Sequence, residues 1–146
     1  MHREIFKWLT FDMAVFAVGN VLLIRYVSGR LDVLNDIGYF KLLVFGLAAY
    51  RAANILSNEP VTKPLRAPFV EESEKEGKVT ERPKRSGFLG AMGQLMYCPS
   101  CTGVWLSAVL VYAYVLYPGS TFLVALFLAL SAIERILAIV VSRLKP

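Results

Sequence analysis

The chain has 146 residues and a net charge of +5, with 56% hydrophobic and only 18% charged residues. Its mean hydropathy is +0.53, whereas soluble domains carry about 25% charged residues, so the composition excludes an ordinary soluble domain. The apolar residues are gathered in long continuous blocks rather than in the alternating pattern of outer-membrane strands, which excludes a β-barrel. We therefore predict an all-α integral membrane protein.

Four apolar blocks are long enough, or nearly so, to cross a hydrocarbon core about 30 Å thick as helices. They cover residues 5–24, 37–56, 102–117 and 121–141. Because no backbone group can stay unpaired in lipid, each block is predicted to be an α-helix. The first block is interpreted as a retained helix, because it contains Asp12 and lacks the small-residue cleavage site of a signal peptide.

The placement of Lys and Arg predicts the orientation. Basic residues lie near both termini and are concentrated in residues 58–86, while the Pro118-Gly119 turn has none. By the positive-inside rule, both termini and residues 58–86 face the cytoplasm, and the expected location is the bacterial inner membrane. Acidic residues are interleaved with the basic ones, so no nucleic-acid partner is indicated. The expected partners are the lipid bilayer, further copies of the chain or other membrane proteins.

The predicted organisation is two antiparallel helical hairpins in one membrane domain. Residues 1–57 form the N-terminal transmembrane hairpin, residues 58–86 a cytoplasmic linker rich in proline and charge, and residues 87–146 an interfacial segment and the C-terminal hairpin. The linker is predicted to be solvated, because its prolines rule out a long helix. The apolar and glycine residues of the segment before Cys98 predict a short interfacial helix. Pro99 is predicted to begin the third transmembrane helix, since proline is tolerated in a first turn.

Three sequence elements carry a resemblance. They are Arg51-Ala-Ala-Asn-Ile-Leu, Val61-Thr62-Lys63-Pro64-Leu65-Arg66 and Cys98-Pro99-Ser100-Cys101-Thr102-Gly103-Val104-Trp105. This pattern resembles a bacterial domain-of-unknown-function family of small multi-helix membrane proteins, which includes the sporulation-associated YjcA-like proteins and has similar genes in phages. The family commonly has Trp and Phe where this chain has Ser100 and Val104. The resemblance, from about Tyr50 to the C-terminus, implies a fold and a membrane location but no activity.

Cys98 and Cys101 are the two cysteines of the chain, and their spacing allows three interpretations. A Cys-Pro-x-Cys run at a helix N-terminus lowers the pKa of its leading thiol and suits redox exchange. A structural zinc ion needs four ligands, so a zinc site would have to be shared between two chains. In the third interpretation, which we favour, the motif is a packing device in which Cys98 caps the third helix and Gly103 lets a neighbour approach. No resident cofactor is predicted.

Charged residues inside the predicted helices are costly and need partners. Asp12, Arg51, Glu134 and Arg135 fall at similar depths on the cytoplasmic side. We predict that Arg51 pairs with Glu134, with Asp12 or with both, as a structural ion pair that fixes helix packing. The alternative is that these residues form a proton or ion path. A pore formed by several copies of the chain is a further possibility.

Two further residues are expected at the membrane surface. Arg66, held by its flanking prolines, is predicted to lie close to the membrane face, in a loop along the surface or docked on the Cys turn near Cys98 or a lipid phosphate. Trp105 is expected to anchor the third helix at headgroup depth. Since the sequence contains no recognisable catalytic set, we predict a non-enzymatic structural or accessory membrane protein, with a membrane thiol protein or a pore as alternatives.

Overall fold

The computed structural model describes residues 2–75, 78–83 and 87–144. Within them, four helices are long and apolar enough to cross a membrane, which confirms the predicted all-α membrane fold. They are α1 His2–Val27, α3 Tyr39–Asn58, α6 Pro99–Leu116 and α7 Pro118–Leu144. As predicted, Pro99 occupies the first turn of α6. Only Tyr117 separates α6 from α7, so this connection is very tight.

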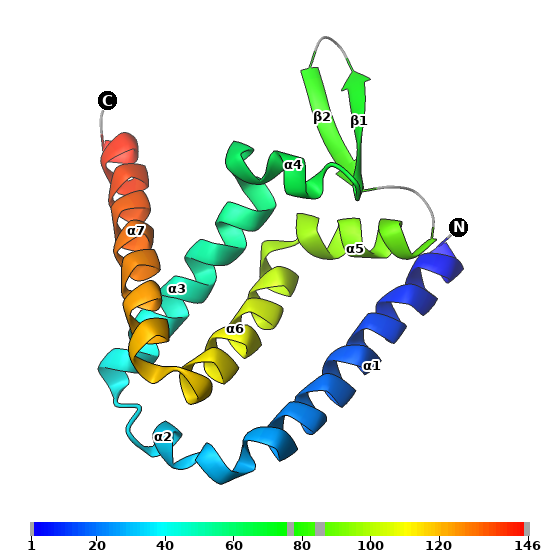
Figure 1. Ribbon diagram of the computed structural model, residues 1–146. Coiled ribbons are helices and arrows are strands. Elements are labelled where there is room, and N and C mark those ends of the chain that lie inside the picture. The colour runs from blue at the N-terminus through cyan, green and yellow to red at the C-terminus, as the bar shows by residue number, and fades with distance from the viewer. Residues whose placement is uncertain (1, 76–77, 84–86, 145–146) are drawn as a thin grey trace.

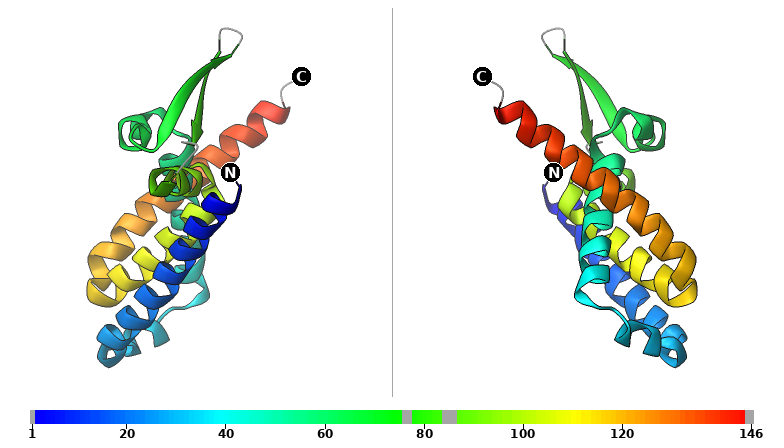
Figure 2. Two further views of the ribbon diagram at one scale, coloured as in Figure 1. Left: turned by 90° about the vertical axis from the view of Figure 1, so that its right-hand side faces the viewer. Right: turned by 90° about the vertical axis from the view of Figure 1, so that its left-hand side faces the viewer.

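Shorter elements join these helices. They are a 3-10 turn Ser28–Arg30, α2 Asp32–Asn35, a 3-10 turn Pro60–Thr62, α4 Lys63–Arg66, β1 Val70–Lys75, β2 Lys78–Pro83 and α5 Gly87–Tyr97. Helix α5 is the predicted short helix before α6. Figure 1 shows it lying across the end of the bundle that also carries α4, the strands and both chain ends, and Figure 2 shows the same from two further sides.

The linker is more ordered than the sequence predicted. Strands β1 and β2 form an antiparallel two-stranded sheet with Val70 opposite Pro83 and Lys75 opposite Lys78. The prolines do exclude a long helix, but Pro68 and Pro83 lie before and at the end of the strands, where they do not interrupt the ladder. Residues 84–86 of the predicted linker lie outside the described residues.

Helix α3 is the centre of the packing, because it contacts both α6 and α7. The buried core is built from Val44 and Ala48 of α3 with Ala125 and Ala129 of α7. Such small side chains let membrane helices approach closely, where dispersion contacts replace the hydrophobic effect that lipid cannot supply. Phe45, which packs edge-to-face on Tyr114 at a ring distance of 5.1 Å, extends this core toward α6.

Helix α1 packs on α5 and α6, rather than mainly on α3. Residues spaced eight and then four positions apart on one face of α1 make this contact. They are Trp8 on Phe88, Phe16 on Trp105, and Asn20, which accepts a hydrogen bond from the Tyr112 hydroxyl at 2.8 Å. The four membrane helices are therefore as predicted, but the grouping into two separately packed hairpins is not confirmed.

Candidate functional site

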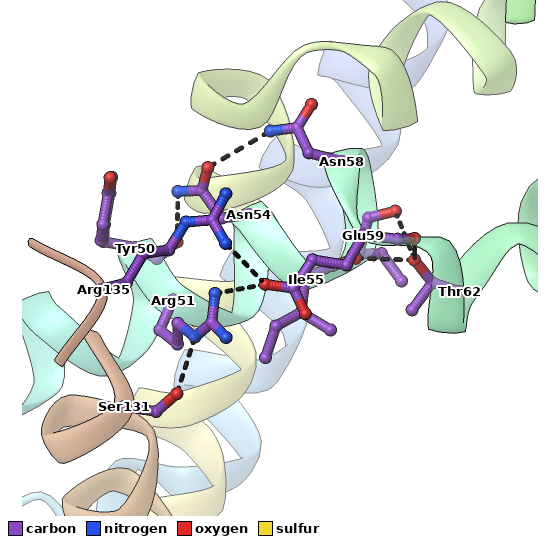
Figure 3. Close-up of polar contacts among 10 residues, drawn as sticks. Tyr50, Arg51, Asn54, Ile55, Asn58, Glu59, Thr62, Ser131 and Arg135 are labelled. Atoms are coloured by element: carbon purple, nitrogen blue, oxygen red, sulfur yellow. Dashed lines mark hydrogen bonds and ion pairs between the residues drawn. The ribbon is translucent and has the colours of Figure 1, made fainter. Parts of the chain in front are cut away.

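A carboxylate shared by two arginines lies where α3 and α7 meet. Glu59 follows the last residue of α3, and its Oε1 atom pairs with the Nη1 atom of Arg51 and, at 3.3 Å, with Nη1 of Arg135. Arg51 also donates from Nε to the Ser131 hydroxyl at 2.9 Å. Figure 3 shows Arg51 and Arg135 converging on Glu59 from α3 and α7. We call Arg51, Glu59, Ser131 and Arg135 the arginine cluster.

Helical spacing explains how the arginine cluster assembles. Glu59 is the C-cap residue just beyond α3 and has an extended backbone, and its side chain meets that of Arg51, which lies eight residues earlier in the helix. Ser131 and Arg135 are four residues apart on α7 and face α3 together. The side chains of Arg51 and Glu59 are only 11% and 21% exposed, whereas that of Arg135 is 42% exposed. The cluster is thus buried on the α3 side and open on the α7 side.

This arrangement corrects the predicted partners of Arg51. Glu134 is exposed, because the residue next to Arg135 is rotated about 100° around α7, away from the α3 contact. Asp12 is buried on α1, which packs on α5 and α6 rather than mainly on α3, the helix that carries Arg51. Its Oδ2 atom has no hydrogen-bond partner among the described residues. The sequence reasoning missed Glu59 because it assigned this residue to the linker. Its position directly after an apolar helix containing Arg51 was the available signal.

Arg66 and Thr62 close the C-terminal end of α3. The guanidinium of Arg66, 5% exposed, donates to the carbonyl oxygens of Ser57 and, at 3.2 Å, Glu59. The Thr62 hydroxyl lies 2.6 Å from the carbonyl oxygen of Ile55. The last carbonyls of a helix lack partners within it, and a cation there also opposes the negative end of the helix dipole. The side chain of Arg66 is therefore buried as a helix cap, while its expected place near the membrane face stays a prediction.

The cysteine pair lies at the start of α6. Cys98 is the N-cap residue, and its sulfur accepts a hydrogen bond from the backbone N–H of Cys101 at 3.4 Å. The Cys101 thiol donates to the same sulfur across 2.8 Å, and both cysteines are free. These hydrogen bonds, the one from the Cys101 thiol above all, lower the pKa of Cys98 below that of an ordinary thiol. This geometry agrees with the interpretation of Cys98 as a helix cap. It is also compatible with the interpretation of the pair as a redox-active thiol.

The described residues offer no group of side chains that could hold a metal ion within one chain. Among the described residues, no group of three or more His, Cys, Asp or Glu side chains lies together. Two thiols are too few for a structural zinc ion, so zinc would need ligands from a second chain.

Next to the cysteine pair, a groove of about 420 Å³ lies between α3 and α6. Its walls include Gly46, Ala49, Tyr50 and Asn54 of α3, and Pro99, Ser100, Gly103 and Ser107 of α6. Gly103 faces Ala53, where an added Cβ would meet the alanine Cβ at 3.9 Å. Trp105 does not line this groove, since its ring packs on Phe16 of α1 at 4.6 Å.

Comparison with known proteins confirms the predicted family. Residues 44–141 match the model of a family described as "Protein of unknown function (DUF1360)". The chain is also 29% identical to the sporulation protein YjcA of Bacillus subtilis (strain 168) over 107 residues, which cover 70% of this chain and 91% of YjcA. No solved structure matches the chain. Because the family model spans more than half of its length, the chain belongs to this family of unknown function, DUF1360.

Proposed function

We propose that the protein is a non-enzymatic accessory component of the membrane, which acts through contacts with other membrane proteins or with further copies of itself. The single observation that carries this proposal is the groove between α3 and α6. It is lined mainly by small residues of two membrane-spanning helices, such as Gly46, Ala49 and Ser107. Small residues are those at which membrane helices approach each other most closely.

The polar groups of the chain support the same conclusion. Arg51 and Glu59 pair with each other, and Arg66 and Thr62 bond backbone carbonyls, so these groups act in holding the helix ends together. Asn20 and Tyr112 likewise pair across α1 and α6. The relative YjcA is named a sporulation protein. An accessory role in a membrane process of that kind is consistent with this proposal.

The orientation in this proposal places both termini, α5 and the β1–β2 sheet on the cytoplasmic side of a bacterial inner membrane. The basic residues of the chain are concentrated at that end, which supports the assignment through the positive-inside rule. In this orientation Cys98 and Cys101 face the reducing compartment, where cysteines stay as thiols.

Photo-crosslinking in living cells tests the proposal. Replacing Tyr50, which lines the groove, with the aromatic photo-crosslinker p-benzoylphenylalanine is expected to give one discrete protein adduct after irradiation. Phe40 on the same helix is 67% exposed and outside the groove, and the same replacement there serves as the matched control. Adducts with lipid alone at both positions would contradict the proposal.

A thiol function is the second candidate, because one specific observation favours it. The two sulfur atoms lie 2.8 Å apart at a helix N-terminus, and the pKa of Cys98 is lowered. Loss of two protons and two electrons to a disulfide-bearing or quinone oxidant would join them in a disulfide. Trapping free thiols in intact cells with a mass-shifting maleimide tests this candidate. An oxidised fraction that changes with growth conditions supports it, and full labelling under all conditions contradicts it.

A further inference from the structure

The arginine cluster carries more positive than negative charge. Two guanidinium groups converge on one carboxylate oxygen of Glu59, and Ser131 contributes a neutral hydroxyl. Arg51 is nearly buried and uses two of its nitrogens in these bonds. Arg135 is 42% exposed, and in the part of the chain that the structure describes its polar contact is the single one with Glu59. One positive charge is therefore left over on the open side of the cluster.

The surroundings of Arg135 restrict what can neutralise this charge. Three of its neighbours along α7 are exposed and apolar, with Ile133 43%, Ile136 41% and Leu137 57% exposed. In a membrane-spanning helix such side chains face lipid. Glu134 is also exposed, but no ion pair joins it to Arg51 or Arg135 among the described residues.

The depth of Arg135 also bears on its partner. Arg135 lies about 26 Å along the helix axis from Pro118, where α7 begins, at 1.5 Å per residue. The hydrocarbon core is about 30 Å thick, so a helix that starts at one interface brings Arg135 close to the opposite one. A long arginine side chain can then extend to the headgroup layer. A guanidinium matches a phosphate with paired, charge-assisted hydrogen bonds.

We propose that the arginine cluster binds the phosphate of an anionic phospholipid, with Arg135 as the contacting residue and Arg51 and Glu59 holding it in place. The lipid belongs to the leaflet on the side of both termini, and its acyl chains lie along the apolar face of α7. The source of the phosphate is a lipid rather than a free anion, because the residues around Arg135 present an apolar surface. This inference does not rest on the accessory function proposed above.

Native mass spectrometry of the full chain in detergent with equal phosphatidylglycerol and phosphatidylcholine tests the inference. The unmodified chain is expected to retain phosphatidylglycerol in preference. Arg135→Gln is expected to reduce that preference about tenfold, the change for one charge-assisted contact. Arg143→Gln, which removes another arginine of α7, is the matched control and is expected to keep it. Glu134→Gln is expected to keep or strengthen it.

In the comparison of variants, an unchanged preference in Arg135→Gln, or a loss of preference in Arg143→Gln alone, would overturn the inference. Release of the lipid by millimolar inorganic phosphate would assign the cluster to a free anion instead, and would also count against it. A measurement on the unmodified chain avoids dependence on the folding of a variant. Phosphatidylglycerol with a photoreactive headgroup is expected to label the peptide that contains Arg135, and labelling confined to other peptides would contradict the proposal.

Discussion

Replacing Glu59 with Gln removes the negative charge on which Arg51 and Arg135 converge, while keeping the size of the side chain. Arg51 is 11% exposed, so its guanidinium would lose its counterion in a nearly buried place. Removing one partner of a buried ion pair costs about 3–5 kcal/mol, because the other charge stays buried without compensation. Since Glu59 itself is 21% exposed, the lower end applies, and we expect Glu59→Gln to reduce the free energy of unfolding by about 3 kcal/mol.

The same reasoning assigns a smaller effect to the open side of the cluster. Arg135 is 42% exposed, so solvent and headgroups screen its pairing with Glu59, and Arg135→Gln is expected to cost less than about 1 kcal/mol. Glu134→Gln changes an exposed carboxylate on the same helix and is the control, expected within about 0.5 kcal/mol of the unmodified chain.

Unfolding by sodium dodecyl sulfate in mixed micelles, followed by circular dichroism, measures these differences. The double variant Arg51→Gln/Glu59→Gln completes a thermodynamic cycle, and it is expected to lose clearly less than the sum of the two single variants. The reasoning is refuted if Glu59→Gln is no less stable than Glu134→Gln, or if the effects of Arg51 and Glu59 simply add.

Three further predictions concern the other polar contacts. Cys98→Ser keeps an N-cap oxygen for α6 while Cys98→Ala does not, so the alanine variant should be about 1 kcal/mol less stable than the serine variant in the same unfolding assay. Because the Cys101 thiol lowers the pKa of Cys98, Cys101→Ala should move the midpoint of the pH profile for iodoacetamide alkylation of Cys98 upward, and an unchanged midpoint would contradict the assigned hydrogen bond. Tyr112→Phe removes the bond to Asn20 and should speed hydrogen exchange in α1 but not in α7; equal effects on both helices would count against the α1–α6 contact.

The parts of the fold that depend on local sequence were predictable. Apolar blocks of sufficient length specify the four membrane helices, and the start of α6 follows from the first-turn preference of Pro99. The short helix α5 follows from the apolar and glycine residues of the segment before Cys98. These signals act over a few residues, so no knowledge of neighbouring helices is needed.

The parts that depend on which helices touch were not predictable. Arg51 and Glu134 lie at similar depths in the sequence-based topology, yet the rotation of α7 presents Ser131 and Arg135 to α3 instead. The role of Arg66 could not be predicted from composition either. A charged residue between prolines is expected to be solvated, whereas Arg66 caps the end of α3. The β1–β2 sheet was missed because charged, proline-flanked segments carry weak strand signals.

The most direct test of the proposed accessory function is the state of the protein when native membranes are extracted into polymer-bounded nanodiscs, without detergent. Discs are purified from cells that carry the full chain or its Cys98→Ser/Cys101→Ser variant. The mass of the complex in each disc is measured, and its proteins are identified. We predict that both contain the same complex, with a second membrane protein or further copies in fixed ratio. Single copies with lipid alone, or a complex lost only in the serine variant although it accumulates normally, would contradict the account.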